Sequence, residues 1–492
     1  MNFSPADLGQ LAEHGIPPAE AERQLTQLRG GQTWLRLARP CTLGDGICTL
    51  PADRHPALLE RFAAAAAAGR VTRFVPASGA ASRMFEALQS GDPAALQRFL
   101  AELDNFPFAA ELAVALSRIG QKLDGVRRSG NLSMLLAALL ETHGLGYARL
   151  PKGLLPFHRT AGEVRTAFAE HLAETAQLVG AGNPARVHCT VSPEHRALFA
   201  QHLAAWQEAL EQRYSAPLEV TFSEQQPATD TLALGADGEP LRDADGRLVL
   251  RPGGHGALLA NLAALAGDLV LIRNIDNVVP DRCKGDNLLW DRLLGGLLLE
   301  LTESQRTLLE RLRRYPADAV GQRRAQEFLG EELGIPLADA DRGAVQLVDL
   351  LDRPVRVCGM VANQGEPGGG PFWVYDKGGG ISRQIVEAAQ VDGGDPHQAA
   401  ILAAATHFNP VDMVCSLRDG RGRAYPLEHF VDQTAAIVTS KRQNGQPIGI
   451  LERPGLWNGG MAGWLTVFVE LPACTFNPVK TIFDLLRPAH QP

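Results

Sequence analysis

The chain has 492 residues, of which 45% are apolar and 21% charged, so it is long enough to bury more than one hydrophobic core. Its formal net charge of −8, with no cluster of Lys and Arg interleaved with aromatic residues, argues against binding to polymeric nucleic acid. No apolar run approaches the roughly 18 residues that span a bilayer, and the acidic N-terminal segment lacks the apolar core of a signal peptide, so a cytoplasmic protein is expected. The seven cysteines are scattered without a Cys-x-x-Cys pair, and we expect them to be reduced and to bind no zinc.

The first part of the chain is predicted to be mainly helical. Residues 1–30 place apolar side chains at helical spacing, and the prolines in GIPPAEAERQL favour the first turn of a second helix. The segment RHPALLERFAAAAAAGR predicts a helix that ends at Gly69, and VTRFVPA after it predicts a strand. Residues 86–145 indicate helices with no strand, and we interpret them as a helical insertion.

Strands then alternate with helices. The pattern predicts helices over 161–179, 193–213 and 256–266, and strands at RVHCTVS, LEVTF, RLVL and DLVLIRNID. This alternation favours an α/β fold, with a Rossmann-like, largely parallel sheet between helices. Residues 284–350 are predicted to be helical, and VRVCGMVA, PFWVYD and LTVFVEL to be strands of a mixed-sheet lobe. We therefore expect three consecutive segments: a helical lead (1–70), an α/β domain (71–350) and a C-terminal lobe (351–492).

The junction PASGAASR, directly after the strand VTRFVP, has the composition of a phosphate-binding turn. Small residues there leave backbone N–H groups accessible, a glycine permits a strained turn, and an arginine supplies a cation beside a bound anion. The residues concerned are Ala77, Ser78, Gly79, Ala80, Ala81, Ser82 and Arg83. The alternative is an ordinary strand-to-helix turn capped by Ser82. The motif matches neither that of P-loop kinases nor that of dinucleotide-binding dehydrogenases, so both classes are disfavoured.

Three later stretches could complete such a site. In ARLPKGLLPFHR, Lys152 lies between two prolines that hold the segment extended, although it could equally be a solvated loop lysine. In LVLRPGGHGALLANL, three glycines (Gly253, Gly254 and Gly256) would allow a flat or charged ligand to approach, and His255 offers a ring; the alternative is a plain helix entry.

The third stretch is the apolar strand in GDLVLIRNIDNVVPD, which ends at Asn274, Asp276 and Asn277. A carboxylate at the carboxyl end of a central strand is where Mg²⁺ is commonly held, together with substrate phosphates. The alternative, an Asx cap of the next turn, explains Asn277 better than it explains Asp276. We therefore predict Asp276 as the metal ligand.

These motifs resemble those of a known enzyme class. PASGAASRM resembles the L-x-x-G-x-G-T-R-L loop of sugar-1-phosphate nucleotidyltransferases, and PKGLLP resembles their P-K-x-L-L-P element. RPGGHG and RNIDN resemble the P-G-H-G and S-N-x-D-N elements of UDP-sugar pyrophosphorylases, in the same order along the chain. With SEQQPATDT, GEPGGGPFW, HFNPVD, PGLWNGGMAGW and TFNPVKT, nearly the whole chain is similar to a bacterial family of unknown function grouped with nucleotidyltransferases.

The resemblance implies a fold of the nucleotide-diphospho-sugar transferase (GT-A) type and a role for each matching residue. The loop around Gly79 and Arg83 would hold the triphosphate, UTP by resemblance, and Lys152 would contact phosphate. The implied remaining contacts are Gln225 and the turn Gly254, His255 and Gly256 for the base, Asp276 for Mg²⁺, Asn409 for the sugar and Lys480 for the sugar phosphate. The sequence departs from the loop pattern at Ala81 and Ser82, and the insertion 86–145 separates the loop from PKGLLP.

The implied reaction is in-line attack of a sugar phosphate oxygen on the α-phosphorus of a nucleoside triphosphate, with release of pyrophosphate. Cations and N–H groups are sufficient for this chemistry because the attacking phosphate is already ionised. Two alternatives stay open: a glycosyltransferase of the same fold, although RNIDN lacks the first Asp of a D-x-D motif, and a non-catalytic sensor of nucleotide-sugars.

Overall fold

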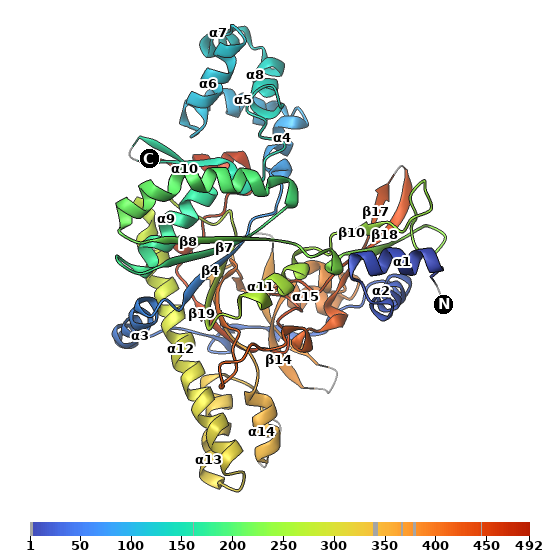
Figure 1. Ribbon diagram of the computed structural model, residues 1–492, viewed down its shortest axis with the longest axis vertical. Helices are drawn as coiled ribbons and strands as arrows, with labels where there is room; N and C mark the ends of the chain where they lie inside the picture. The colour runs from blue at the N-terminus through green and yellow to red at the C-terminus, as the bar shows by residue number, and fades with distance from the viewer. Residues whose placement is uncertain (1–2, 161, 338–342, 366–367, 377–379, 444) are drawn as a thin grey trace. The chain divides into compact units, whose positions relative to one another are not determined.

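The computed structural model describes residues 3–160, 162–337, 343–365, 368–376, 380–443 and 445–492 (Figure 1). The chain folds into two compact units. Unit 1 comprises Met1–Phe62, Glu224–Leu271 and Leu293–Pro472, and unit 2 comprises Ala63–Ser223, Ile272–Arg292 and Ala473–Pro492. This division differs from the three consecutive segments expected from the sequence, because each unit is assembled from pieces far apart along the chain.

Unit 2 contains the α/β part of the site. Strand β4 (Val71–Pro76) pairs in parallel with β7 (Ala185–Val191), and β8 (Leu218–Glu224) follows β7 in the strand order. Helices α9 (Ala167–Val179) and α10 (Arg196–Tyr214) separate these strands along the chain, and α3 (His55–Ala67) precedes β4. Nearly every residue of α9 is buried, which is typical of a helix inside a core. The predicted alternation of strand and helix is therefore confirmed here.

A β-hairpin precedes α9 where only helix was expected. Strands β5 (Pro156–Thr160) and β6 (Glu163–Thr166) pair antiparallel, so the helix predicted over 161–179 begins at Ala167 instead; residue 161 lies outside the described residues. The helix starts there because the Thr166 side chain accepts the N–H of Ala169, an N-cap hydrogen bond.

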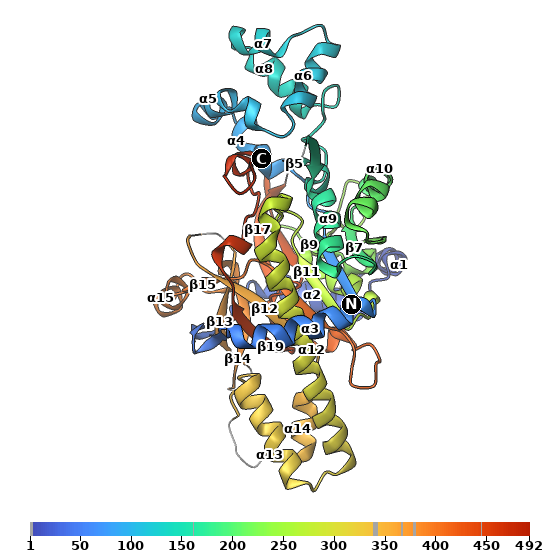
Figure 2. The same ribbon diagram turned by 90° about the vertical axis from the view of Figure 1, so that its left-hand side faces the viewer.

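The insertion 86–145 is helical throughout, as predicted. It consists of α4 (Glu86–Gln89), α5 (Pro93–Ala101), α6 (Ala109–Arg118), α7 (Leu123–Ser129) and α8 (Leu132–Leu140), which lie together in Figures 1 and 2. Asp92 and Asn131 cap α5 and α8 with their side-chain oxygens. The buried rings of Phe99, Phe106 and Phe108 pack with centroids 5.1–5.4 Å apart, so the insertion has its own core.

Unit 1 contains a mixed sheet. Strand β12 (Val355–Ala362) pairs in parallel with β19 (Leu465–Glu470) and antiparallel with β16 (Asp412–Ser416) and with the short β15 (His407–Phe408). On its other side β19 pairs in parallel with β3 (Gly46–Cys48), which pairs in turn with β2 (Thr42–Leu43). The predicted strands VRVCGMVA and LTVFVEL are thus confirmed, whereas β2 and β3 lie in the segment expected to be a helical lead.

Two smaller sheets complete unit 1. Strand β13 (Gly369–Tyr375) lies between β1 (Leu37–Pro40) and β14 (Ile381–Glu387), and α15 (Pro396–Ala403) contacts β1; residues 366 and 367 of the GEPGGGPFW motif lie outside the described residues. The second sheet has the order β10 (Leu250–Arg251), β9 (Thr231–Leu234), β18 (Gln446–Glu452) and β17 (Ile437–Gln443). Of the predicted strand RLVL (residues 247–250), only Leu250 lies in β10.

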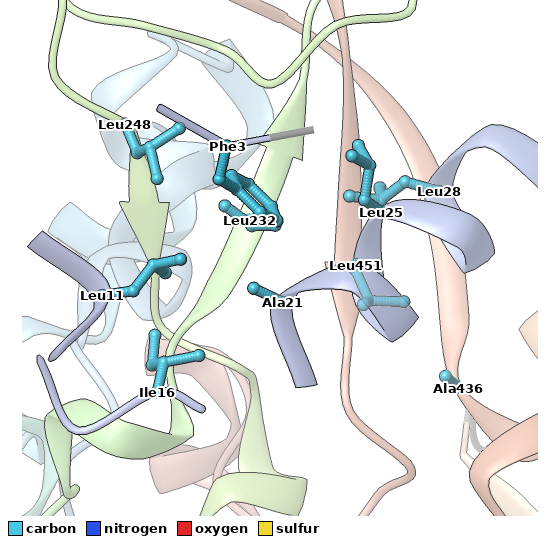
Figure 3. Close-up of a cluster of buried hydrophobic side chains, with 10 residues drawn as sticks. All are labelled: Phe3, Leu11, Ile16, Ala21, Leu25, Leu28, Leu232, Leu248, Ala436 and Leu451. Carbon is cyan, nitrogen blue, oxygen red and sulfur yellow. The ribbon is translucent and has the colours of Figure 1, made fainter. Parts of the chain in front are cut away.

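The N-terminal helices α1 (Pro5–His14) and α2 (Pro18–Gly30) pack on this four-stranded sheet. Figure 3 shows Leu11, Leu25 and Leu28 of the helices against Leu232 and Leu451 of β9 and β18. The predicted helices over 1–30 are confirmed, and burial of their apolar stripe against the sheet explains why they form.

The segment 284–350 is helical in its described part. It forms α12 (Lys284–Arg314), α13 (Ala319–Glu327), a π-helical turn (Phe328–Glu332) and α14 (Ala344–Leu351), while 338–342 lie outside the described residues. Helix α11 (Leu259–Leu265) is followed by β11 (Leu269–Arg273), the strand predicted to end at the site. Among the residues described, no helix is both long and apolar enough to cross a membrane. None of the seven cysteines, all of which are described, forms a disulfide.

Candidate phosphate site

Two lysines from distant segments meet one carboxylate just after β11. The Nζ atom of Lys152 donates to Oδ2 of Asp276 at 3.0 Å, and Nζ of Lys480 donates to the same oxygen at 3.0 Å and to Oδ1 at 3.3 Å. Asp276 is buried, with 6% of its surface exposed, whereas the side chain of Lys480 is 51% exposed. All three residues belong to unit 2. Three segments that the sequence analysis singled out separately therefore converge on one point.

The cluster has an excess of positive charge. Burial acts to raise the pKa of Asp276, but the ammonium groups of Lys480 and Lys152 outweigh it and hold the pKa below its ordinary value, so the carboxylate is ionised. One negative and two positive side chains leave a net charge of +1 at a partly exposed position. Such a group attracts an anion, and ammonium groups are common ligands of phosphate.

The backbone joins the small-residue loop to the lysine segment. The N–H of Lys152 donates to the carbonyl of Gly79 at 3.1 Å, and the N–H of Ala81 donates to the carbonyl of Leu150 at 3.3 Å. Ala80 and Pro151 form an isolated antiparallel bridge between these hydrogen bonds. The loop after β4 therefore lies beside Lys152, as a shared phosphate site requires.

The Lys480 segment is fixed to the strand end in a similar way. The N–H of Val479 donates to the carbonyl of Asp276 at 3.0 Å, and the N–H of Asn477 donates to Oδ1 of Asn277 at 2.9 Å. On the other side, the Asp484 carboxylate accepts the N–H of Lys480 at 2.8 Å. Asn277 is buried and holds the backbone, whereas the two oxygens of Asp276 face the lysines. Asp484, which places Lys480, was not singled out from the sequence; the signal is the Thr-x-x-Asp spacing of a capping box.

The structure of the loop differs in two details from the sequence-based expectation: the conformation of Gly79 and the capping role of Ser82. Gly79 does not adopt a positive φ, and a Cβ atom there would meet nothing within 4 Å, so the free protein does not need its freedom as a strained turn. The loop leads into a 3₁₀ turn, Ser82–Phe85, and then the single-turn helix α4, which is too short for a developed helix dipole. Ser82 is not the cap, because Ala81 occupies the N-cap position without a side-chain hydrogen bond. The small residues Ser78, Gly79 and Ala80 are exposed, as are Ser82 and Arg83, while Ala77 and Ala81 are buried.

A buried network of charges lies in unit 2 at the end of β11. Oε1 of Glu174 accepts from Arg73 at 2.8 Å and from Arg273 at 2.6 Å, and Asp291 accepts from Arg73 at 2.8 Å and from Arg273 at 3.4 Å. All four side chains are at most 2% exposed. Burial raises the pKa of Glu174, but Arg273 and Arg73 outweigh it and lower the pKa to about 2. Sequence analysis missed this network, although arginines inside the apolar strands β4 and β11 were a visible signal.

His171 connects this network to the site. It is fully buried, and its Nε2–H donates to the carbonyl of Asn274 at 3.2 Å. Burial, together with the charge of Arg73, lowers the pKa of His171 to about 3, so the ring is neutral. A neutral, fixed histidine thereby anchors the turn that carries Asp276.

The remaining candidate residues lie in unit 1. The Nδ1 atom of His255 accepts the N–H of Leu456 at 3.1 Å, and its ring lies on Trp457 with centroids 4.3 Å apart. A Cβ atom at Gly256 would come within 2.1 Å of the Pro454 carbonyl oxygen, and one at Gly253 within 2.5 Å of the Thr229 carbonyl oxygen. The chain itself therefore uses the space that the sequence analysis assigned to a ligand at these two glycines.

Within the turn formed by residues 253–256, Gly254 has a positive φ of 74°, which favours glycine. The Glu452 side chain lies beside it. Gln225 is half-buried and donates to Asp230 at 3.3 Å. Asn409 is buried, where it donates to the Gly359 carbonyl at 3.2 Å and accepts the N–H of Val411 at 3.2 Å. Both groups of its amide are used within the fold.

A magnesium ion would find one carboxylate at this site. Within the ranges that the structure describes, no group of three or more His, Cys, Asp or Glu residues is placed to hold a metal. Mg²⁺ is usually bound through one or two carboxylates together with substrate phosphates, and Asp276 supplies one ionised, buried carboxylate. In the free protein, Lys152 and Lys480 donate to both oxygens of Asp276. The donor set therefore fits Mg²⁺ when substrate phosphate oxygens complete the coordination and replace Asp276 as the acceptors of the two lysines.

The chain belongs to the family described as a domain of unknown function, DUF4301, whose model matches residues 4–491, which confirms the predicted membership of a family of unknown function. No curated protein matches it. Among solved structures, the UDP-N-acetylglucosamine pyrophosphorylase of Trypanosoma brucei is 14% identical with a TM-score of 0.49, covering 98% of this chain and 79% of that chain. A mutant UDP-glucose pyrophosphorylase from Leishmania major, in complex with UDP-glucose, is 12% identical with a TM-score of 0.46, covering 98% and 77%. At TM-scores below 0.5, these likenesses carry no weight in assigning a function.

Proposed function

We propose that this family member is a nucleotidyltransferase that makes a nucleotide-sugar, with a UDP-sugar as the expected product, from a nucleoside triphosphate and a sugar 1-phosphate. The observation that carries the proposal is the convergence of Lys152 and Lys480 on Asp276, beside the small-residue loop around Gly79. These are four segments whose sequences resemble the phosphate-binding elements of UDP-sugar pyrophosphorylases. A fold of the nucleotide-diphospho-sugar transferase (GT-A) type is part of the same proposal.

The two lysines would exchange one anion for another when substrate binds. In the free protein they neutralise Asp276; in the complex, phosphate oxygens would replace the carboxylate as their acceptors. The Nζ atom of Lys152 also donates to the Val479 carbonyl at 3.1 Å. Lys152 is therefore the more fixed of the two lysines. Lys480 is half-exposed and free to follow the sugar phosphate. Both ammonium groups would stabilise charge that accumulates on phosphate oxygens during transfer.

The loop and the strand end would position the other groups. Exposed N–H groups of Ser78, Gly79 and Ala80 and the guanidinium of Arg83 would bind the triphosphate. Asp276 would hold Mg²⁺ together with phosphate oxygens, and a bound Mg²⁺ supplies charge neutralisation and orientation of the phosphates. The base contacts (Gln225, Gly254, His255 and Gly256) and the sugar contact (Asn409) that the resemblance implies remain predictions.

Product analysis tests the proposal against its alternatives. The protein is incubated with Mg²⁺, a labelled nucleoside triphosphate and each of a panel of sugar 1-phosphates, and pyrophosphate is measured. We expect pyrophosphate and a labelled nucleotide-sugar in equal amounts with at least one sugar phosphate. In a parallel incubation with a labelled nucleotide-sugar, sugar transfer without pyrophosphate would indicate a glycosyltransferase instead. Saturable binding of nucleotide-sugar with neither product would indicate a sensor.

A further inference from the structure

A groove in unit 1 is lined mainly by arginine. Its cavity volume is ≈ 300 Å³, and its lining consists of Arg306, Leu309, Glu310, Arg313, Arg314, Gly420 and Arg421. One wall is a face of α12, because residues 306, 309, 310 and 313 are spaced three or four apart and lie on the same side of a helix. The other wall is the turn that carries Gly420 and Arg421, closed by the bridge between Arg418 and Ala424. The walls meet where Gly420 packs on Arg306; a Cβ atom there would lie 3.2 Å from Cγ of Arg306.

The groove is electropositive. Arg313 is paired with Asp352, whereas in the described parts of the chain no carboxylate lies within ion-pair distance of Arg306, Arg314 or Arg421. Counting Glu310 and Asp352 against the four arginines leaves an excess of two positive charges, in a chain whose overall charge is −8. Cations around one cavity repel each other, and an anion bound between them would offset this repulsion.

Helix stability accounts for only part of this cluster. Arg313 and Arg314 lie in the last turn of α12, where positive side chains interact favourably with the helix dipole. Arg306 lies further from that end, and Arg421 comes from a different element. For these two arginines, the described part of the chain provides neither an ion pair nor a helix-end position that would account for their charge.

We propose that this groove binds a small anion carrying two or more phosphate groups, at a site separate from Asp276. Guanidinium groups match phosphate oxygens with two parallel hydrogen bonds, so several arginines around one cavity favour a chain of phosphates over a single carboxylate. The volume lies at the lower end of the range for ligand sites, about 300–1,000 Å³. Of the described residues that line the groove, none is aromatic, so they provide no ring on which a nucleobase would stack. The ligand is thus recognised through its phosphates, whether it is inorganic or part of a nucleotide.

Calorimetric titration with inorganic triphosphate, without Mg²⁺, tests the groove. We expect two sites in the wild type, one in the groove and one at the lysine pair. The variant Arg306→Gln/Arg421→Gln should retain only the lysine site, and Lys152→Ala/Lys480→Ala should retain only the groove. Arg118→Gln/Arg323→Gln, which removes the same charge from two exposed arginines outside the groove, should bind as the wild type does. If the double glutamine variant does not fold, Arg306→Lys/Arg421→Lys replaces it, with binding at the groove weakened by about tenfold or more.

The outcomes separate this site from the proposed function. Unchanged stoichiometry in the folded groove variant would overturn the groove site, and so would an equal loss in the control variant, which would indicate non-specific attraction. Loss of binding in the groove variant with no change in the lysine variant would support the groove and contradict the phosphate role of Lys152 and Lys480. A parallel titration with a nucleoside triphosphate identifies the source: equal affinity at the groove supports recognition through phosphates, whereas binding that requires the base would overturn it.

Discussion

Asp276 is both the predicted metal ligand and the counter-ion of two lysines, and replacing it with asparagine separates these roles. Asp276→Asn keeps the shape of the side chain but removes its charge, so the net charge of the cluster rises from +1 to +2. Without Mg²⁺, a bound phosphate then meets two lysines that are no longer neutralised. With Mg²⁺, the proposed enzyme has lost the carboxylate that would hold the ion.

The two effects have opposite signs. One additional unneutralised charge about 5 Å from a phosphate contributes about 1–3 kcal/mol for an effective dielectric constant of roughly 20–80, so Mg²⁺-free triphosphate affinity should rise about 5- to 150-fold. Mg²⁺-dependent pyrophosphate release should fall by about two powers of ten or more, the loss typical of removing a key electrostatic group. Stability should decrease by only about 1–3 kcal/mol, because Lys480 is half-exposed and can turn toward water while Lys152 keeps its hydrogen bond to Val479.

Calorimetry without Mg²⁺, a pyrophosphate release assay with Mg²⁺ and urea denaturation measure these three quantities. Asp53→Asn is the matched control, because it removes the same charge from an exposed aspartate outside the site. Near-normal turnover of a folded Asp276→Asn protein would refute the metal assignment and most of the proposed function. Weaker binding of triphosphate without Mg²⁺ would refute the view that Asp276 and the phosphates compete for the lysines.

Three further predictions concern the loop, the exposed lysine and pH. Gly79→Val should leave the free energy of unfolding unchanged, since a Cβ atom there meets nothing within 4 Å, yet abolish triphosphate binding if phosphates lie against this backbone; unchanged affinity by calorimetry would contradict the loop's role. Lys480→Ala should reduce the dependence of the rate on sugar phosphate by about tenfold or more while triphosphate affinity changes less than twofold; equal losses in both would place Lys480 on the triphosphate. Burial lowers the pKa values of His171 and His490 to about 3, so below pH 6.5 the unfolded chain binds protons that the folded chain does not. The free energy of unfolding should therefore fall from pH 6.5 toward pH 3, by up to about 1.4 kcal/mol per pH unit and histidine; urea denaturation at several pH values measures this slope, which should be smaller in His171→Gln.

The parts of the fold that the sequence predicted are those with strong local patterns. The run VRVCGMVA coincides with β12, and the helices of the insertion 86–145 lie where helical periodicity placed them. Strands β1, β2 and β3 have two to four residues each, too few for a clear local pattern; β1 and β3 pair with the distant strands β13 and β19, and β2 pairs with β3. The hairpin before α9 pairs two adjacent segments, and it was missed because the helix predicted over 161–179 was extended across β6.

The candidate site could likewise be predicted only in part from the sequence. Each of the segments that carry Gly79, Lys152, Asp276 and Lys480 was singled out by its residue types, but their convergence was not derivable from residue types alone. Lys152 and Lys480 are 124 and 204 residues from Asp276 along the chain, and only tertiary structure brings both to its Oδ2 atom. At Gly253 and Gly256 a neighbouring carbonyl oxygen lies where a Cβ atom would stand, and no local sequence pattern indicates such a contact.

The insertion 86–145 lies next to the segments that carry the loop, Lys152 and Lys480. The chain leaves for it directly after the loop and returns directly before Lys152, and the hydrogen bonds of Gly79 and Ala81 close this neck. Its far contacts reach the third segment: the Arg98 guanidinium lies 4.8 Å from the centroid of the Phe483 ring, and Phe106 also packs on Phe483, three residues after Lys480. The insertion therefore contacts, directly or through this neck, the chain segments that carry the loop, Lys152 and Lys480. Because α4 is a single turn, the backbone N–H groups of the loop and nearby cations, rather than a long helix dipole, would provide the positive potential for a bound phosphate.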